Sequence, residues 1–235
     1  MNFVKLQYGF VYLKCKEHKL PITCLALSPD GKFLFSASKD CNIVKCAHQK
    51  HAHSAIIYCL AVAPDNKFLA SGDAAGTLNL WNPETLVHLS NFKGHKAAVT
   101  GVAFCSETNQ LYSGSSDRTV NVWNLTDLCF IETLHGHQTG ITDVDIMSKD
   151  RVITSGGSDN TVRLWKIDEE SQLIYAGHKR NIDLVRRLTN QIFVSAGDDG
   201  IIYIDCFIVP LSGRMDDILS ESYEVPLACY EFHPM

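Results

Sequence analysis

The chain has 235 residues, of which 46% are hydrophobic and 20% are charged, a composition typical of globular proteins rather than disordered ones. Its apolar runs are far shorter than the roughly 20 residues that cross a bilayer, and its start lacks a signal-peptide core, so we expect an intracellular protein without a membrane span. A net charge of −5 argues against coating by nucleic acid, and nine cysteines without a CxxC pair argue against a disulfide framework or a zinc ribbon.

The charge is unevenly distributed along the chain. Residues 1–53 hold eight lysines against three acidic residues, giving +5. The remainder holds 13 basic and 23 acidic residues, giving −10. The N-terminal part is therefore the electropositive end of the protein.

Strand pairs are predicted at 25–38 and 60–73, which read LALSPDGKFLFSAS and LAVAPDNKFLASGD. In both segments a Pro-Asp-Gly or Pro-Asp-Asn turn separates two runs rich in Leu, Val and Phe. This pattern is typical of a β-hairpin. We therefore expect antiparallel strands in these segments.

The run CAHQKHAHS at 46–54 follows the first strand pair. Its imidazoles and thiol, on Cys46, His48, His51 and His53, are common metal ligands. A second ligand pair is missing, however, and His53 also belongs to the repeat described next. We therefore predict a loop between repeats and no metal site.

A fixed spacing recurs along the chain. The segments SGDAAGTLNLW, SGSSDRTVNVW and SGGSDNTVRLW end at Trp81, Trp123 and Trp165, two steps of 42 residues. Two degenerate copies, SASKDCNIVKC and SAGDDGIIYID, carry Cys46 and Asp205 in the Trp place. A period of this length indicates one folding unit repeated in series.

Each copy is led by a histidine, and a turn position follows it 21 or 22 residues later. This defines five copies, near 18–46, 53–81, 95–123, 137–165 and 178–205, inside a domain at 1–210 that an irregular tail at 211–235 follows. The pairs of leading and turn residues are His18 with Asp40, His53 with Ala75, His95 with Asp117, His137 with Asp159, and His178 with Asp199.

The Gly-His and Trp marks at this period resemble the WD-repeat family, which implies an all-β fold, a β-propeller whose blades are four-stranded antiparallel sheets. The resemblance also implies a buried polar set in each blade, made of the leading His, a strand Ser or Thr, the turn Asp and the Trp. Because Ala75, Cys46 and Asp205 break this set, we expect blades 2, 1 and 5 to be less rigid. The two complete sets are His95, Ser113, Asp117 and Trp123, and His137, Ser155, Asp159 and Trp165.

The same Ser, His and Asp could be taken for a catalytic triad. A nucleophilic site is needed once and lies in a cleft, whereas this trio recurs in successive copies. We therefore predict a structural role for these residues, no catalytic residues, no cofactor and no enzymatic activity.

Several further segments lie outside the general WD pattern. Their joint occurrence in this order resembles the WD-repeat subunit family of the U3 small nucleolar ribonucleoprotein (snoRNP). The segments are FSASKDCNIVK at 35–45, NQLYSGSSDRTVNVWN at 109–124, ETLHGHQ at 132–138 and EESQLIYAGHKRNID at 169–183.

This resemblance implies a nuclear, nucleolar protein that binds the box B/C region of U3 snoRNA. The implied partners are a kink-turn-binding protein and other proteins of the small-subunit processome, and the implied role is rRNA processing in ribosome biogenesis, without a membrane or a small-molecule substrate. The alternative is a generic WD scaffold or a ubiquitin-ligase substrate adaptor, which the propeller alone equally permits.

The resemblance implies seven blades, whereas only five copies are recognisable. An open propeller would leave unpaired strand edges. Either the segment GFVYLKC at 9–15 supplies the outer strand of the last blade, or the strand YEVPLACYEF at 223–232 covers the edge. The sequence leaves both possibilities open.

RNA would be met by exposed basic residues. In WD blades the leading loop and the Asp turn open on one face, so basic residues next to them are expected to share a rim. Arg186 and Arg187, near the hairpin of the fifth copy, are weaker candidates. The predicted rim residues are Lys19, Lys39, Lys96, Arg118, Lys179 and Arg180.

Overall fold

The computed structural model describes residues 3–7, 10–13, 17–45 and 48–206. These residues form 21 β-strands joined by turns and loops, and the predicted all-β propeller architecture is confirmed. Within these ranges no helix has the length and apolar character that crossing a membrane requires.

Five antiparallel sheets, blades 1 to 5, follow one another along the chain. Blades 1 to 4 have four strands each, and blade 5 has three described strands. In every blade each strand pairs with the next one in sequence. The strands are β3 (Ile22–Leu27), β4 (Leu34–Ser38), β5 (Asn42–Lys45) and β6 (His48–His51); β7 (Ile57–Val62), β8 (Leu69–Asp73), β9 (Thr77–Trp81) and β10 (His88–Lys93); β11 (Val99–Cys105), β12 (Gln110–Ser115), β13 (Thr119–Asn124) and β14 (Cys129–His135); β15 (Ile141–Ser148), β16 (Arg151–Gly156), β17 (Thr161–Lys166) and β18 (Ser171–Ala176); and β19 (Ile182–Arg187), β20 (Ile192–Gly197) and β21 (Ile202–Cys206).

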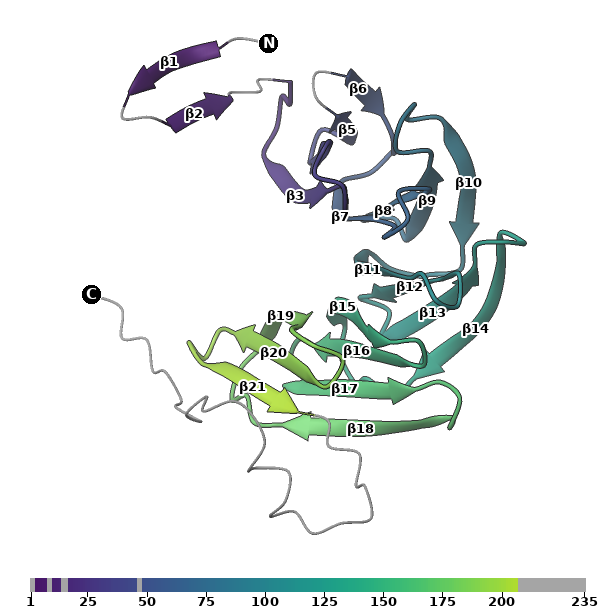
Figure 1. The fold of residues 1–235 in the computed structure, drawn as a ribbon. Helices are drawn as coiled ribbons and strands as arrows, with labels where there is room; N and C mark the ends of the chain where they lie inside the picture. Colours follow the sequence, from purple (N-terminus) through teal and green to yellow (C-terminus); the bar gives the residue numbers. More distant parts are fainter. Residues whose placement is uncertain (1–2, 8–9, 14–16, 46–47, 207–235) are drawn as a thin grey trace.

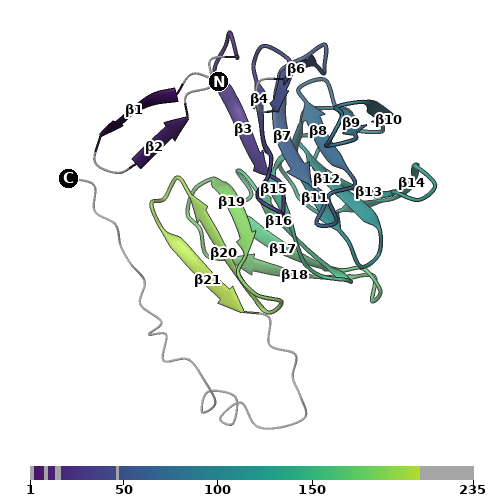
Figure 2. The same cartoon turned by 45° about the horizontal axis from the view of Figure 1, so that its top comes forward.

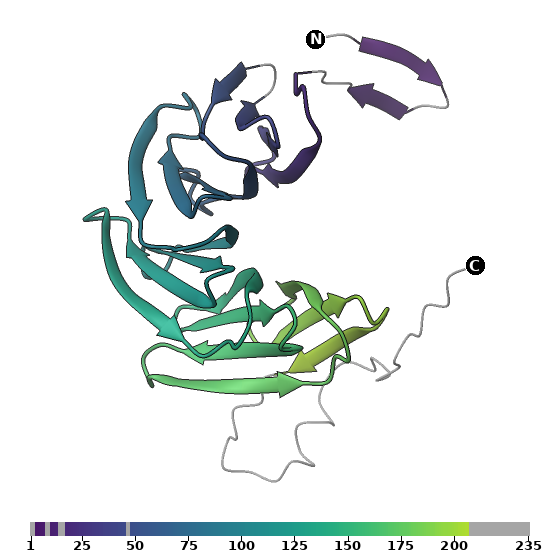
Figure 3. The same cartoon turned by 180° about the vertical axis from the view of Figure 1, so that it is seen from behind.

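The blades are arranged round an arc, from blade 1 in blue-purple to blade 5 in yellow-green (Figures 1 and 3). Figure 2 shows the first strands of successive blades gathered toward the centre of this arc. These strands contact one another in the order β3, β7, β11, β15 and β19. The inner strands therefore form the concave side of the molecule.

The hydrophobic core is divided into four clusters, and each cluster lies between two neighbouring blades. The cluster between blades 2 and 3, for example, joins Leu78 and Leu80 to Phe104, Leu111 and Trp123. Similar clusters join blades 1 and 2, 3 and 4, and 4 and 5. Stability therefore comes from the packing of each blade on the next.

A β-bulge at the start of each inner strand shifts its register, and a bulge can redirect a side chain. In three blades the residue at the bulge is a threonine whose hydroxyl donates a hydrogen bond to the first carbonyl of the next inner strand. The sequence pattern did not predict these hydrogen bonds between blades. They run from Thr23 to Ile57 (2.6 Å), from Thr100 to Ile141 (2.6 Å) and from Thr142 to Ile182 (2.7 Å).

The two ends of the arc expose apolar side chains, Leu25 and Leu27 on β3 and Ile202 and Ile204 on β21. Of the two possibilities for covering the open edge, the structure does not show closure by residues 9–15: strand β2 (Phe10–Leu13) pairs with β1 (Phe3–Gln7) in a separate hairpin. The alternative segment at 223–232 lies outside the described residues. Blade 5 thus keeps β21 as its outermost described strand.

Candidate nucleic-acid interface

Blade 3 contains the expected polar set as one hydrogen-bonded chain. His95 Nδ1 lies 3.0 Å from Asp117 Oδ2, and His95 Nε2 lies 2.8 Å from Ser113 Oγ. Trp123 Nε1 donates to the same Ser113 oxygen at 2.8 Å. Since a carboxylate only accepts, Nδ1 carries the proton, and Nε2 then accepts from the serine hydroxyl. Every member of the set is satisfied.

The predicted set of blade 4 is wrong at one residue: Thr154 takes the place that the sequence assigned to Ser155. Thr154 Oγ1 lies 2.8 Å from His137 Nε2 and accepts a 2.8 Å bond from Trp165 Nε1. The ring of His137 also lies 2.8 Å from Asp159. The Ser155 side chain instead contacts Thr142, at 2.8 Å.

The reason is one extra residue in the hairpin of blade 4. Three residues separate β12 from β13, whereas four separate β16 from β17. Ser113 pairs with Asn121, two residues before the Trp of its blade, and Thr154 pairs with Arg163, also two residues before its Trp. Counting back from the turn Asp therefore gives a residue on the wrong face of the strand.

Thr154→Val is expected to lower the free energy of unfolding by about 2 kcal/mol, because it leaves the buried His137 and Trp165 nitrogens without their shared partner. Ser155→Ala should cost less, since Thr142 keeps its bond to the Ile182 carbonyl. Urea denaturation of both variants makes this comparison. A larger loss for Ser155→Ala would restore the original assignment.

Blade 2 is complete, contrary to the expectation that Ala75 breaks its set. Asp73, two residues earlier, accepts from His53 Nδ1 at 2.8 Å, and its other oxygen accepts from the backbone nitrogens of Ala75 and Thr77. Ser71 lies 2.6 Å from His53 Nε2. Asp73, at the end of β8, thus makes the hydrogen bonds that the turn aspartate makes in the other blades.

Blades 1 and 5 keep the His and Asp of the set. His18 lies 3.2 Å from Asp40, and His178 lies 2.9 Å from Asp199. Cys46 lies outside the described residues. In blade 5 Asp205 stands in the Trp place, where burial raises its pKa, and the ring of Tyr203 packs against His178 with a centroid distance of 4.6 Å.

The residue after the leading His binds the turn Asp through its backbone nitrogen in four blades. The nitrogens of Lys19, Lys96, Gln138 and Lys179 donate to this carboxylate at 2.8–3.1 Å. These residues therefore occupy equivalent places. The six predicted cations divide among three blades, Lys19 and Lys39 in blade 1, Lys96 and Arg118 in blade 3, and Lys179 and Arg180 in blade 5, and all six are exposed.

Arg118 occupies the left-handed backbone region, with φ at 74°. A left-handed φ costs a residue with a Cβ roughly 1–2 kcal/mol. In blade 5 a glycine, Gly200, stands at the same turn position with φ at 73°. The arginine therefore stands where glycine would fit the backbone better.

Arg118→Gly is expected to raise the free energy of unfolding by up to about 1 kcal/mol, since glycine adopts this φ without strain. The change removes the guanidinium and leaves the turn intact. Thermal unfolding monitored by circular dichroism checks the result. A loss of more than about 1 kcal/mol would show that the side chain stabilises the turn.

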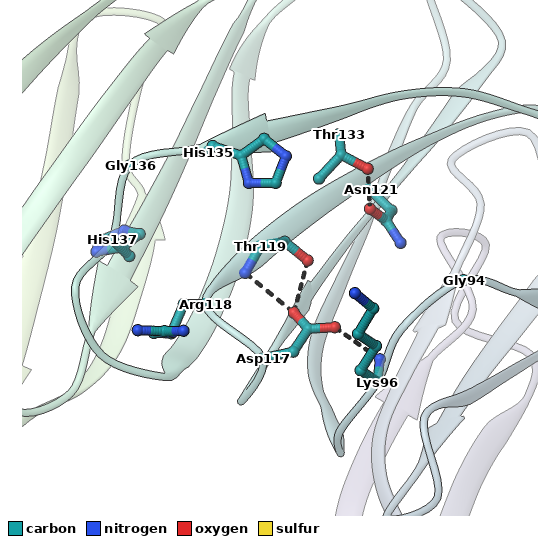
Figure 4. A pocket seen from close by; sticks show the side chains of 10 residues that line it. All are labelled: Gly94, Lys96, Asp117, Arg118, Thr119, Asn121, Thr133, His135, Gly136 and His137. Carbon is teal, nitrogen blue, oxygen red and sulfur yellow. Dashed lines mark hydrogen bonds between the residues drawn. The ribbon is translucent and has the colours of Figure 1, made fainter.

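Lys96 and Arg118 line one pocket of about 560 Å³ at blade 3. We call it the blade-3 pocket, and Figure 4 shows Lys96 and Arg118 on either side of Asp117, with the ring of His135 across from them. Burial raises the pKa of Asp117, but hydrogen bonds from Thr119, the Lys96 backbone and His95 outweigh it and hold the pKa below its usual value. The Asp117 carboxylate is therefore ionised and already hydrogen-bonded within the protein. The side-chain charges of Lys96 and Arg118 are left to bind a ligand.

The sequence missed His135 and Asn121, which also line the blade-3 pocket. His135 ends β14 next to the leading loop of blade 4, and Asn121 lies on β13 opposite Ser113. The position two residues before each Trp could have indicated Asn121, because Asn79 stands there in blade 2. No comparable signal marked His135.

Arg186 and Arg187 lie on the inner strand β19, away from the rim. The Arg186 guanidinium pairs with Asp143 of blade 4, and the Arg187 backbone nitrogen donates to Asp145 at 2.8 Å. They also line a pocket of about 330 Å³ between inner strands. Their role in the fold is to join blades 4 and 5.

The His-rich segment forms no metal cluster in the part of the chain that the structure describes. The His51 ring lies 3.1 Å from Asn42, and His53 belongs to the polar set of blade 2. Residues 46 and 47 lie outside the described ranges.

Comparison with known proteins places these features in a family. Mouse (Mus musculus) U3 small nucleolar RNA-interacting protein 2 is 49% identical over 205 residues, which cover 80% of this chain and 43% of the mouse protein. The human (Homo sapiens) protein of the same name is 46% identical with the same coverage. A solved structure of U3-55K superposes with a TM-score of 0.79 at 41% identity, covering 81% of this chain and 62% of that one.

The chain thus spans less than half the length of these two curated relatives. Four segments, 10–44, 44–82, 86–124 and 128–166, match the family described as WD domain, G-beta repeat. Blade 5 lies beyond the matched residues and repeats the same His–Asp hydrogen bond. The matched repeats and the repeated polar set show that the chain belongs to the WD-repeat family.

Proposed function

We propose that the chain is a non-enzymatic RNP subunit that associates with U3 snoRNA. The observation that carries this proposal is the 46–49% identity to proteins named for their interaction with that RNA. Exposed cations at equivalent places of blades 1, 3 and 5 support it, since phosphate contacts from Lys and Arg position RNA-binding proteins. A net charge of −5 does not prevent such local binding.

The finer proposal follows from the family resemblance. The chain would bind the box B/C region of U3 snoRNA beside a kink-turn-binding protein and other small-subunit processome proteins, in the nucleolus. There it would support pre-rRNA processing by holding an RNA–protein surface in place.

The absence of catalysis is supported by the geometry of the polar sets. The serine or threonine oxygen of blades 2, 3 and 4 accepts the Trp Nε1 hydrogen and is buried. A nucleophile must reach its substrate. These hydroxyls are instead enclosed between strands, and the arrangement recurs from blade to blade.

A general protein-interaction scaffold is the alternative, and the apolar ends of the arc favour it because exposed apolar patches mark protein contacts. Nuclease treatment separates the two functions. A scaffold keeps its partners after RNA is digested, whereas an RNP subunit loses part of its complex.

Crosslinking and sequencing of RNA bound to the tagged chain in its native cells tests the proposal. Strong enrichment of U3 snoRNA at box B/C is expected. RNA recovery at background, from a soluble and folded chain, would overturn it.

A further inference from the structure

The blade-3 pocket differs from the corresponding places in its neighbours. Asn121 is only 2% exposed, and its Oδ1 accepts a 2.7 Å hydrogen bond from Thr133. Its amide nitrogen donates to no described residue. Because Asn121 lines the blade-3 pocket, this unused donor can hydrogen-bond an acceptor that enters the pocket.

Blade 2 shows how the same position looks when it is closed. The Asn79 amide nitrogen donates to the Ala52 carbonyl at 3.1 Å, and its oxygen accepts from Asn91 at 2.7 Å. In blade 4 the position is Arg163, which donates to Gln172 at 2.8 Å. The Arg163 Nε is buried without a partner among the described residues, so an unused donor at this position is not particular to blade 3. Asn121 provides a possible ligand contact because it lines the blade-3 pocket.

The other groups at the pocket suit an anion that carries a flat ring. Lys96 and Arg118 supply two cations. Their charged ends form no salt bridge with an acidic side chain among the described residues. The His135 imidazole is exposed and makes no hydrogen bond to the described residues, so it can stack on a base. An acidic peptide would use the cations and could accept from the Asn121 amide, but it would not need the imidazole face.

We propose that the blade-3 pocket seats one unpaired nucleotide of an RNA strand. The charged ends of Lys96 and Arg118 bind the phosphate, the base stacks on His135, and the Asn121 amide donates to the edge of the base. A volume of about 560 Å³ is within the usual range of ligand pockets, roughly 300–1,000 Å³. This inference rests on the proposed association with RNA and assigns it to a single site.

The test measures the affinity of the full chain for a short fluorescent single-stranded RNA by anisotropy at several salt concentrations. Arg118→Gly should weaken binding about tenfold and reduce the salt slope by about 0.7, the loss of one phosphate contact to a single strand. The matched control is Asn160→Gly, which relaxes the same left-handed turn in blade 4, with φ at 55°, and removes no charge. It also removes the 2.8 Å hydrogen bond from the Asn160 amide to the Arg180 carbonyl.

A second pair of variants examines stacking. His135→Ala should weaken binding about tenfold, whereas His135→Phe should keep most of the affinity, because base stacking needs an aromatic face and not an imidazole. Crosslinked nucleotides should also map by mass spectrometry to the peptide around His135.

The outcomes separate the site from the function. If the unaltered chain binds RNA and all four variants bind equally, the pocket assignment is overturned while the proposed function stands. If the unaltered chain binds no RNA, both are overturned. If Arg118→Gly weakens binding to a poly-glutamate probe as much as to RNA, and the two His135 variants do not differ, the pocket is a peptide site instead.

Discussion

Asp73→Ala is expected to lower the free energy of unfolding by about 3 kcal/mol. The side chains of Asp73 and His53 are 1% and 0% exposed, and the carboxylate accepts three hydrogen bonds, from His53, Ala75 and Thr77. Removing it leaves a buried imidazole N–H and two backbone N–H groups without partners, each costing about 1 kcal/mol or more. Burial already lowers the pKa of His53, so the ring cannot recover the loss by taking up a proton at neutral pH. Urea denaturation of the variant gives the value.

Ala75→Asp is the matched control for this prediction. If the spacing of 22 residues from the leading histidine determined which residue binds the ring, position 75 would be the place of the turn aspartate. Ala75→Asp in the Asp73→Ala background would then restore stability. The structure predicts no rescue, because Asp73 at the end of β8 holds the His53 ring and Ala75 is exposed. Full rescue by the second substitution would show that the blade adopts the turn that the spacing indicates.

The sequence was sufficient to predict the repeat and the architecture. Histidine and tryptophan at a 42-residue step, with Pro-Asp turns between apolar runs, identified four-stranded blades, because a strand has a two-residue period and a hairpin needs its turn residues. The sequence also predicted that Lys19, Lys96 and Lys179 occupy equivalent places in their blades, since each comes directly after a leading histidine.

The partners inside each blade could not be predicted to the residue. One extra residue in the hairpin of blade 4 puts Thr154, and not the predicted Ser155, in the polar set. In blade 2 the set is completed by an aspartate two residues before the predicted turn position. Both outcomes depend on hairpin length, which a fixed count from a motif ignores. Contacts between blades were missed for a different reason: Asp143 and Arg186 are 43 residues apart, and neither belongs to the repeated motif.

The junction of blades 4 and 5 contains a carboxylate whose ionisation the fold opposes. The Asp143 side chain is 11% exposed, and it accepts a 3.1 Å bond from the Val185 backbone and pairs with Arg186, which is 50% exposed. Burial raises the pKa of Asp143 to about 6, although Arg186 and the hydrogen bonds act in the opposite direction. Because this pKa lies above the unfolded value of about 3.9, the group favours the folded state most below pH 4, and stability falls as pH rises from about 4 to about 6.

Arg186→Ala should therefore destabilise the protein by about 2 kcal/mol at pH 8 and by clearly less at pH 5. At pH 8 the variant must either bury an unpaired carboxylate or keep it protonated, whereas at pH 5 Asp143 is already mostly protonated in the folded protein. The half-exposed guanidinium keeps this estimate below the 3–5 kcal/mol of a fully buried pair.

Two variants control for effects other than this ion pair. Arg187→Ala, next in the chain, removes one 3.3 Å bond to the Met147 carbonyl and should cost little at either pH. In an Asp143→Asn background, Arg186→Ala should lose its pH dependence, because no carboxylate remains to titrate. Urea denaturation at both pH values decides the matter: an equal loss at pH 5 and pH 8 would mean that Arg186 stabilises the junction through packing of its side chain and not through its charge.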